Sequence, residues 1–197
     1  VSTLMYSGHS IVTMTTSMMS PVPPKISNET TQLNPPGREI HLRQLILWRH
    51  AEAEDGHVGM DDLQRQLTKI GRKQAEKMAT WLHRRMPAAT VIYASPARRT
   101  CQTADALELP YSVANAIAPD ATPQALLQTA LDCAADEVLL VGHQPTLGRL
   151  AAMLLSGTDQ DWSVKKGAIW WFTLSNWHPD GTSATVRLKA CLTAEMA

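Results

Sequence analysis

The chain has 197 residues, and its 18 Lys and Arg balance 18 Asp and Glu, so the formal net charge at pH 7 is zero. This length is typical of one domain, and a neutral charge lacks the basic excess of proteins that bind nucleic acid or acidic membranes. No apolar run approaches the roughly 20 residues of a membrane span, and the three cysteines, Cys101, Cys133 and Cys191, lack the spacing of a metal or redox pair. We therefore expect a cytoplasmic protein with reduced thiols.

Residues 1–40 differ in composition from the rest of the chain. Ser, Thr and Pro are frequent there, charges are sparse, and no helical or strand period persists. A secretory signal would begin with a positive charge and a continuous apolar stretch, but the first Lys is Lys25. We therefore interpret residues 1–40 as a disordered tail and residues 41–197 as one folded domain.

The folded part alternates predicted strands with predicted helices. Short apolar runs predict strands at 45–48, 91–93, 137–141, 168–174 and 184–188, with a turn at 179–181 joining the last two. Helix-starting residues predict four helices, at Thr68, Ser95–Pro96, Pro123 and Pro145. Apolar residues of helical period follow Thr68, Pro123 and Pro145. Gly157 is expected to end the last helix. This alternation predicts an α/β fold, a three-layer α/β/α sandwich with a mostly parallel central sheet.

Cationic and imidazole side chains follow three of the predicted strands. Arg49 and His50 end the first strand, Arg99 lies in the helix after the second, and His143 ends the third. Ligands of such sheets bind beyond the carboxyl ends of the strands, so we expect these side chains to meet at one edge. Arginine donates in a planar, bidentate manner to phosphate oxygens. Nearby arginines should lower the pKa of His50 and leave a neutral, nucleophilic imidazole.

A metal site is the alternative interpretation of the loop after the first strand. Two histidines and three carboxylates lie within eight residues there: His50, Glu52, Glu54, Asp55 and His57. The acids can equally be solvated loop charges. We expect no metal and no cofactor, because the arginines supply the positive charge that a phosphoryl group needs.

Four ordered segments resemble the histidine phosphatase superfamily, whose members are phosphoglycerate mutase-like. They are the segment at 47–52 that contains Arg-His-Ala, the Ser-Pro-x-x-Arg-x-x-Gln-Thr segment at 95–103, the Val-Gly-His segment at 141–143, and the Arg-Gln-Leu-Thr-x-x-Gly segment at 65–71. The last segment resembles the SixA-type branch, the protein phosphohistidine phosphatases. The resemblance implies that His50 is the nucleophile and that Arg49, Arg99 and His143 hold the phosphoryl group. It also makes Arg65 a substrate-binding candidate.

The chain departs from the family pattern at two points. Ala51 replaces a glycine, and the segment that carries a proton donor in larger members is short here and offers only Asp120. The resemblance implies that a phosphocarrier or a histidine-containing phosphotransfer domain is the partner, dephosphorylated through a phosphohistidine on the enzyme. The alternatives are a small-molecule phosphomonoesterase of the same superfamily and a catalytically silent phosphate-binding module.

Overall fold

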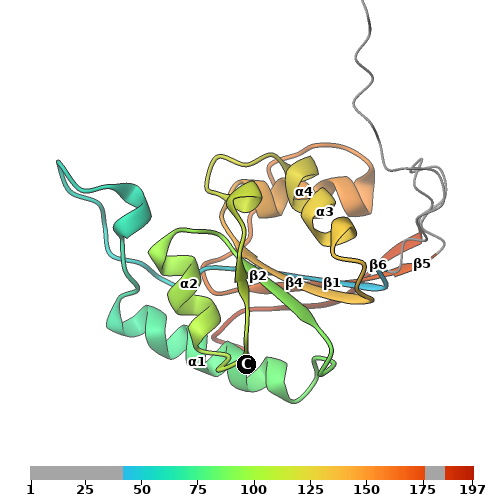
Figure 1. The fold of residues 1–197 in the computed structure, drawn as a ribbon, viewed down its shortest axis with the longest axis horizontal. Helices are drawn as coiled ribbons and strands as arrows, with labels where there is room; N and C mark the ends of the chain where they lie inside the picture. Colours follow the sequence, from blue (N-terminus) through green and yellow to red (C-terminus); the bar gives the residue numbers. More distant parts are fainter. Residues whose placement is uncertain (1–41, 176–184) are drawn as a thin grey trace, which may run out of the picture. The chain divides into compact units, whose positions relative to one another are not determined.

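The computed structural model describes residues 42–175 and 185–197, and these residues form the α/β domain drawn in Figure 1. The tail expected at 1–40 and the turn expected at 179–181 lie outside the described residues. Within the described part of the chain, no helix combines the length and the apolar character needed to cross a membrane.

A mixed sheet of six strands forms the centre of this domain. Its strands are β1 (Gln44–Arg49), β2 (Val91–Ala94), β3 (Ser112–Val113), β4 (Glu137–Gly142), β5 (Ile169–Ser175) and β6 (Thr185–Leu192). Their order across the sheet is β3-β2-β4-β1-β5-β6. Neighbours from β3 to β1 pair in parallel, whereas β5 pairs antiparallel with both β1 and β6. The parallel half therefore brings the carboxyl ends of β1, β2 and β4 to one edge.

Four helices cover the two faces of the sheet (Figure 1). They are α1 (Lys69–His83), α2 (Arg98–Asp105), α3 (Pro123–Asp132) and α4 (Thr146–Ser156), with short 3-10 helices η1 (Asp62–Gln64) and η2 (Asn115–Ile117) between them. On the face of α1 and α2, the buried core includes Trp48 and Met78. On the face of α3 and α4, it includes Leu47, Leu126 and Leu150. The predicted three-layer α/β/α fold is confirmed.

Three of the sequence-based helix boundaries are confirmed and one is wrong. Thr68 caps α1 by accepting from the Gly71 N–H at 2.9 Å, α3 begins at Pro123, and Gly157 ends α4 with a φ of 71°. Ser95, however, does not cap α2, which begins at Arg98 after an extended Ala97. The physical reason is that the Ser95 hydroxyl is bound to a side chain from another strand end.

Gly71 fixes how closely α1 approaches the loop after β1. A Cβ atom at this position would lie 1.9 Å from the Glu52 carbonyl oxygen, closer than atoms can pack. Glycine is therefore required for the contact, because only a residue without a Cβ allows two backbones to approach this closely. The Thr68 hydroxyl adds a 2.8 Å hydrogen bond to the Glu52 carboxylate. The start of α1 is thus held against Glu52, which is two residues from His50 along the chain.

Candidate active site

The ends of β1 and β4 place two histidines side by side. Arg49 pairs with Gly142 in the parallel ladder, and the backbone N–H of His50 donates to the Gly142 carbonyl at 3.1 Å. His143 directly follows β4, and its ring centroid lies 5.3 Å from that of His50. The sheet therefore brings together two residues that are 93 positions apart in sequence.

A cavity of about 280 Å³ opens at this edge of the sheet. It is lined by Arg49, His50, Ala53, Asp62, Arg65, Arg99, Pro119, His143, Gln144 and Lys166. The lining includes four side chains with cationic groups and a single carboxylate, so the cavity carries an excess of positive charge. This electrostatic environment favours a compact anion with several oxygens.

Hydrogen bonding fixes the tautomer of His50. This residue is 6% exposed, and its Nδ1 lies 2.8 Å from the Ala51 carbonyl oxygen. A carbonyl can only accept, so Nδ1 carries the proton and Nε2 keeps its lone pair. Burial is the main cause that lowers the pKa of His50 to about 4, and the charges of Arg99 and Arg49 act in the same direction. At neutral pH the imidazole is therefore neutral, with Nε2 free to act as a nucleophile.

His143 is held in the opposite tautomer. Its Nδ1 lies 3.3 Å from Nη2 of Arg99, and a guanidinium can only donate, so Nδ1 accepts. Its Nε2–H then donates to the Ser95 hydroxyl at 2.7 Å. Burial lowers the pKa of His143 to about 3, with further contributions from His50 and Arg99. Ser95 is thus a positioning residue for His143 that the sequence interpretation assigned to helix capping instead.

Arg49, at the end of β1, and Arg99, in α2, each keep one buried donor without a hydrogen-bond partner among the residues that the structure describes. Arg49 Nη1 donates to the Val164 carbonyl at 2.7 Å, and Arg99, which is only 3% exposed, donates to the Asp62 carbonyl at 2.6 Å. Within the described residues, the buried Nε of each guanidinium has no hydrogen-bond partner. Unpaired buried donors are unfavourable, so both side chains retain capacity to donate to an incoming oxyanion.

Asp62 is a residue of the cavity that the sequence interpretation did not identify. Its carboxylate accepts from Arg99 Nη2 and from Arg65 Nε, each at 2.8 Å. Partial burial acts to raise the pKa of Asp62, but the hydrogen bonds and charges of the two arginines outweigh it and lower the pKa. The ionised carboxylate therefore uses guanidinium donors that a phosphoryl group would need. Its spacing of three residues from Arg65 was the only signal of this pairing in the sequence.

We expect Asp62→Asn to bind sulfate more tightly than the unsubstituted chain. The substitution removes a negative charge that competes for Arg99, and because the pair is partly exposed, the gain should be about two- to fivefold. Sulfate inhibition of aryl phosphate hydrolysis measures the affinity. Asp55→Asn, an exposed acid of the same loop, is the matched control. An unchanged sulfate affinity in Asp62→Asn would show that Asp62 does not compete with the anion.

The remaining candidates from the sequence lie in different surroundings. Arg65 lines the cavity and also donates to the Glu54 carbonyl at 3.0 Å. Pro119 lines the cavity, whereas its neighbour Asp120 is exposed and is not part of the lining. His57 is exposed, and in residues 42–175 and 185–197 no three His, Cys, Asp or Glu side chains gather as metal ligands would. Lys166 completes the cavity and carried no signal in the sequence.

Fold and cavity together define an α/β protein with a cavity rich in cationic side chains at the carboxyl ends of its parallel strands. Residues 45–119 match the model of the histidine phosphatase superfamily (branch 1), a segment that contains Arg49, His50 and Arg99. This match covers 75 of the 197 residues, and over this segment the chain is similar to the histidine phosphatase superfamily. This similarity supports a hydrolase that acts on phosphoryl groups.

Solved structures share this fold at low sequence identity. One is assigned as the phosphohistidine phosphatase SixA of Agrobacterium tumefaciens, with 21% identity, 77% of this chain and 98% of that chain covered, and a TM-score of 0.64. The protein histidine phosphatase SixA complexed with tungstate is 24% identical, with 77% and 97% covered and a TM-score of 0.62. Mycobacterial glucosyl-3-phosphoglycerate phosphatase is 21% identical, with 75% and 97% covered and a TM-score of 0.55. A comparison with curated protein sequences gives no match.

Proposed function

We propose that the chain is a phosphatase that removes the phosphoryl group from a phosphohistidine on a partner protein. The observation that carries this proposal is the state of His50. Its Nδ1–H is held by the Ala51 carbonyl at 2.8 Å, so the unprotonated Nε2 belongs to a neutral imidazole in a cavity that Arg49, Arg99 and His143 also line. The expected partner is a phosphocarrier or a histidine-containing phosphotransfer domain.

The reaction proceeds in two displacements at phosphorus. The His50 Nε2 lone pair forms an N–P bond while the N–P bond to the partner's imidazole breaks, and the departing nitrogen keeps the electron pair and takes up a proton. Water then attacks the phosphorus of phospho-His50, loses a proton and returns the electron pair to Nε2. Arg49, Arg99 and His143 hold the equatorial oxygens and stabilise charge in both transition states.

The nature of the leaving group fits the absence of Asp120 from the cavity lining. An imidazole takes up a proton near neutral pH, so its departure depends less on a dedicated acid than the departure of an alkoxide does. The described segment between α2 and α3 contains only β3 and η2, so no inserted domain covers the cavity from this side. A cavity that the described segment between α2 and α3 leaves uncovered supports a phosphoryl group that is presented on the surface of a protein.

A panel of substrates tests this proposal. Phosphorylated histidine proteins, sugar phosphates, nucleotides and an aryl phosphate are compared by kcat/KM. We expect the highest value for a phosphohistidine protein, because an imidazole is a good leaving group and the segment between α2 and α3 leaves the cavity uncovered. Higher values for sugar phosphates or nucleotides would support the small-molecule phosphomonoesterase instead. Binding of sulfate without turnover of any substrate would support the silent phosphate-binding module.

A further inference from the structure

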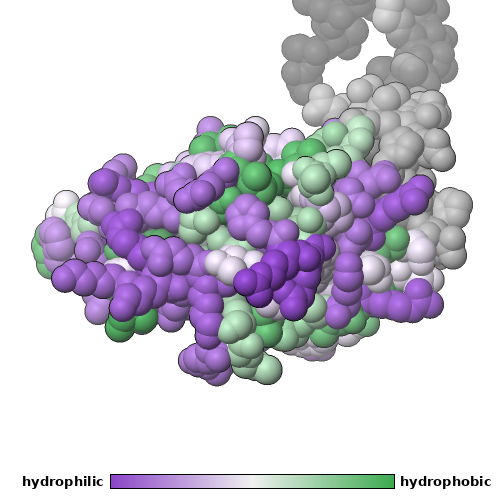
Figure 2. Space-filling model, turned by 90° about the horizontal axis from the view of Figure 1, so that it is seen from below, coloured by the Kyte–Doolittle hydropathy of each residue, from purple (hydrophilic) through white to green (hydrophobic). Residues whose placement is uncertain are grey.

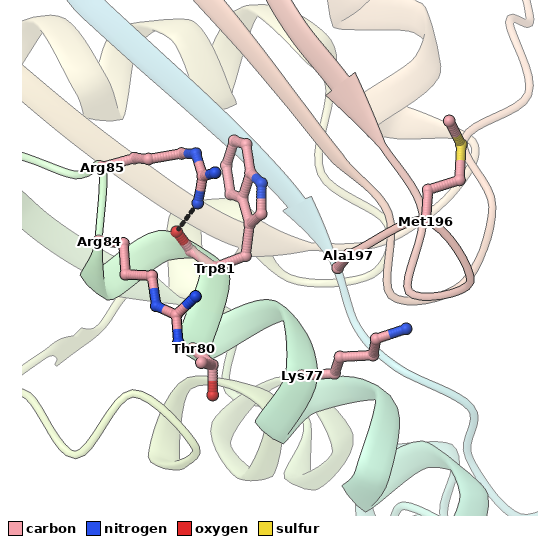
Figure 3. A pocket seen from close by; sticks show the side chains of 7 residues that line it. All are labelled: Lys77, Thr80, Trp81, Arg84, Arg85, Met196 and Ala197. Carbon is pink, nitrogen blue, oxygen red and sulfur yellow. Dashed lines mark hydrogen bonds between the residues drawn. The ribbon is translucent and has the colours of Figure 1, made fainter.

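Two further cavities lie along α1. The first, of about 390 Å³, is lined by Arg49, Gln74, Ser163, Lys165, Lys166, Thr193, Ala194 and Glu195. It shares Arg49 and Lys166 with the active-site cavity, so the two adjoin. The second, of about 430 Å³, is lined by Lys77, Thr80, Trp81, Arg84, Arg85, Met196 and Ala197 (Figure 3).

These two cavities follow the same pair of chain segments. Gln74 of the first and Lys77 of the second are one helical turn apart on α1, and Glu195 and Met196 are adjacent in the chain. Both cavities therefore lie between α1 and residues 193–197, in line from the active site toward the carboxyl end of α1. We refer to them together as the α1 groove.

The α1 groove lies on a strongly basic face. Between residues 69 and 85 the chain has six Lys or Arg and one Glu, although the whole chain is neutral. Figure 2 shows the side of the domain on which α1 lies, with a broad band of hydrophilic residues across it. Lys77, Arg84 and Arg85 are exposed, and no ion pair to another described residue involves them. Arg85 Nη1 donates to the Trp81 carbonyl at 3.2 Å, but no carboxylate of a described residue neutralises these three charges.

The floor of the groove is partly apolar. The Arg85 guanidinium lies 4.6 Å from the centroid of the Trp81 ring, and Figure 3 shows Met196 and Ala197 on the opposite side of the cavity from α1. Near the active site, Lys165 already lies 3.9 Å from a carboxylate, that of Glu195. The groove therefore combines cationic and apolar side chains. The Glu195 carboxylate lies beside Lys165, where an acidic side chain of a ligand would bind.

We propose that the α1 groove binds an acidic segment of the protein that carries the phosphohistidine, an inference that rests on the proposed function. From Gln74 to Arg84, the residue that directly follows α1, the helix axis rises by about 15 Å. An extended peptide covers that distance with about five residues. The partner is thus a protein in which about five residues, rich in Asp and Glu, lie beside the phosphohistidine. The cavity has a single aromatic ring among its described lining residues, that of the half-buried Trp81, and this favours a peptide over an oligonucleotide, which uses successive aromatic rings as stacking platforms.

Matched peptides test the groove through turnover. Each contains one phosphohistidine with five Glu or five Gln on its amino-terminal or carboxyl-terminal side. For one orientation, we expect the unsubstituted chain to prefer the Glu peptide by about tenfold in kcat/KM, mainly through KM, since two or more exposed ion pairs form. Rising salt should reduce that preference. Equal kcat/KM for Glu and Gln peptides in both orientations would overturn the proposal.

Charge reversal on α1 locates the effect. In Lys77→Glu/Arg84→Glu we expect the preference for the Glu peptide to disappear, while aryl phosphate turnover stays unchanged because neither residue lines the active-site cavity. The matched control is Lys69→Glu/Arg72→Glu, which reverses two exposed charges of α1 that line neither cavity of the groove. An equal loss in the control would overturn the groove and indicate a general effect of charge.

Calorimetric binding of the unphosphorylated Glu peptide separates this inference from the proposed function. Binding that is lost in Lys77→Glu/Arg84→Glu, combined with no turnover of any phosphohistidine peptide, would support an acidic-peptide groove and contradict the proposed function. Glu195→Gln removes the carboxylate beside Lys165, and we expect it to tighten peptide binding. The assignment of the groove to a protein partner would be overturned if an oligonucleotide bound more tightly than the Glu peptide and lost that binding in Lys77→Glu/Arg84→Glu.

Discussion

Replacement of His50 by Ala should abolish turnover of every phosphorylated substrate. The neutral Nε2 of His50 is the atom that forms the covalent bond, and His143 cannot replace it because its Nε2–H donates to Ser95 and its Nδ1 faces Arg99. Brief incubation of the unsubstituted chain with phosphorylated substrate should leave phosphate on the protein that is labile to acid and stable to base. The same incubation of His50→Ala should leave none.

His57→Ala is the matched control for this experiment. It removes another histidine of the loop after β1, but one that is exposed and does not line the cavity. We expect it to keep both the label and the turnover. Substantial activity in His50→Ala together with an inactive His143→Ala would reverse the roles of the two histidines.

Replacement of Arg99 by Ala should reduce kcat/KM for an aryl phosphate by about 10²–10³, equivalent to about 3–4 kcal/mol of transition-state stabilisation. The nucleophile survives in this variant, but a buried, charged donor to the phosphoryl oxygens is lost. Steady-state kinetics measures the change, and thermal unfolding checks that the variant is folded.

Arg98→Ala is the control for Arg99→Ala. The two arginines are adjacent at the start of α2, but Arg98 is exposed whereas Arg99 is 3% exposed and lines the cavity. We expect Arg98→Ala to keep nearly full activity. Similar losses in the two variants would contradict the assignment of Arg99 to the phosphoryl group and would indicate a general effect of charge on α2.

The strand ends could be predicted from sequence because the signals there are local. Continuous apolar runs mark β1 and β4 as strands buried on both faces, and the rule for parallel sheets then places Arg49, His50 and His143 at one edge. The Thr68 side chain caps α1, and the ring of Pro123 fixes the backbone at the first residue of α3, so both helix starts depend on effects within one turn. These features need no knowledge of tertiary contacts.

The roles of Ser95 and Asp62 could not be predicted because they depend on distant partners. A serine before a proline is typical of a helix start, but the hydroxyl of Ser95 instead accepts from His143, 48 residues away. In the sequence, Asp62 is one of several acidic residues between β1 and α1. Only the folded structure brings its carboxylate to Arg99, 37 residues away. Neither partner is within the range of local pattern rules, which cover about one helical turn.

The close contact at Gly71 fixes the position of α1 relative to the active site, so that an approaching protein meets the helix at a set distance from His50. Since the backbone of Gly71 abuts the Glu52 carbonyl, α1 cannot slide along its axis without moving the loop that contains His50. Every position on α1 therefore has a set distance from the attacking nitrogen. A partner that engages the helix at one register presents its phosphorylated side chain at one depth in the cavity. Recognition would then depend on the spacing between the acidic segment and the phosphohistidine as well as on the charge of that segment.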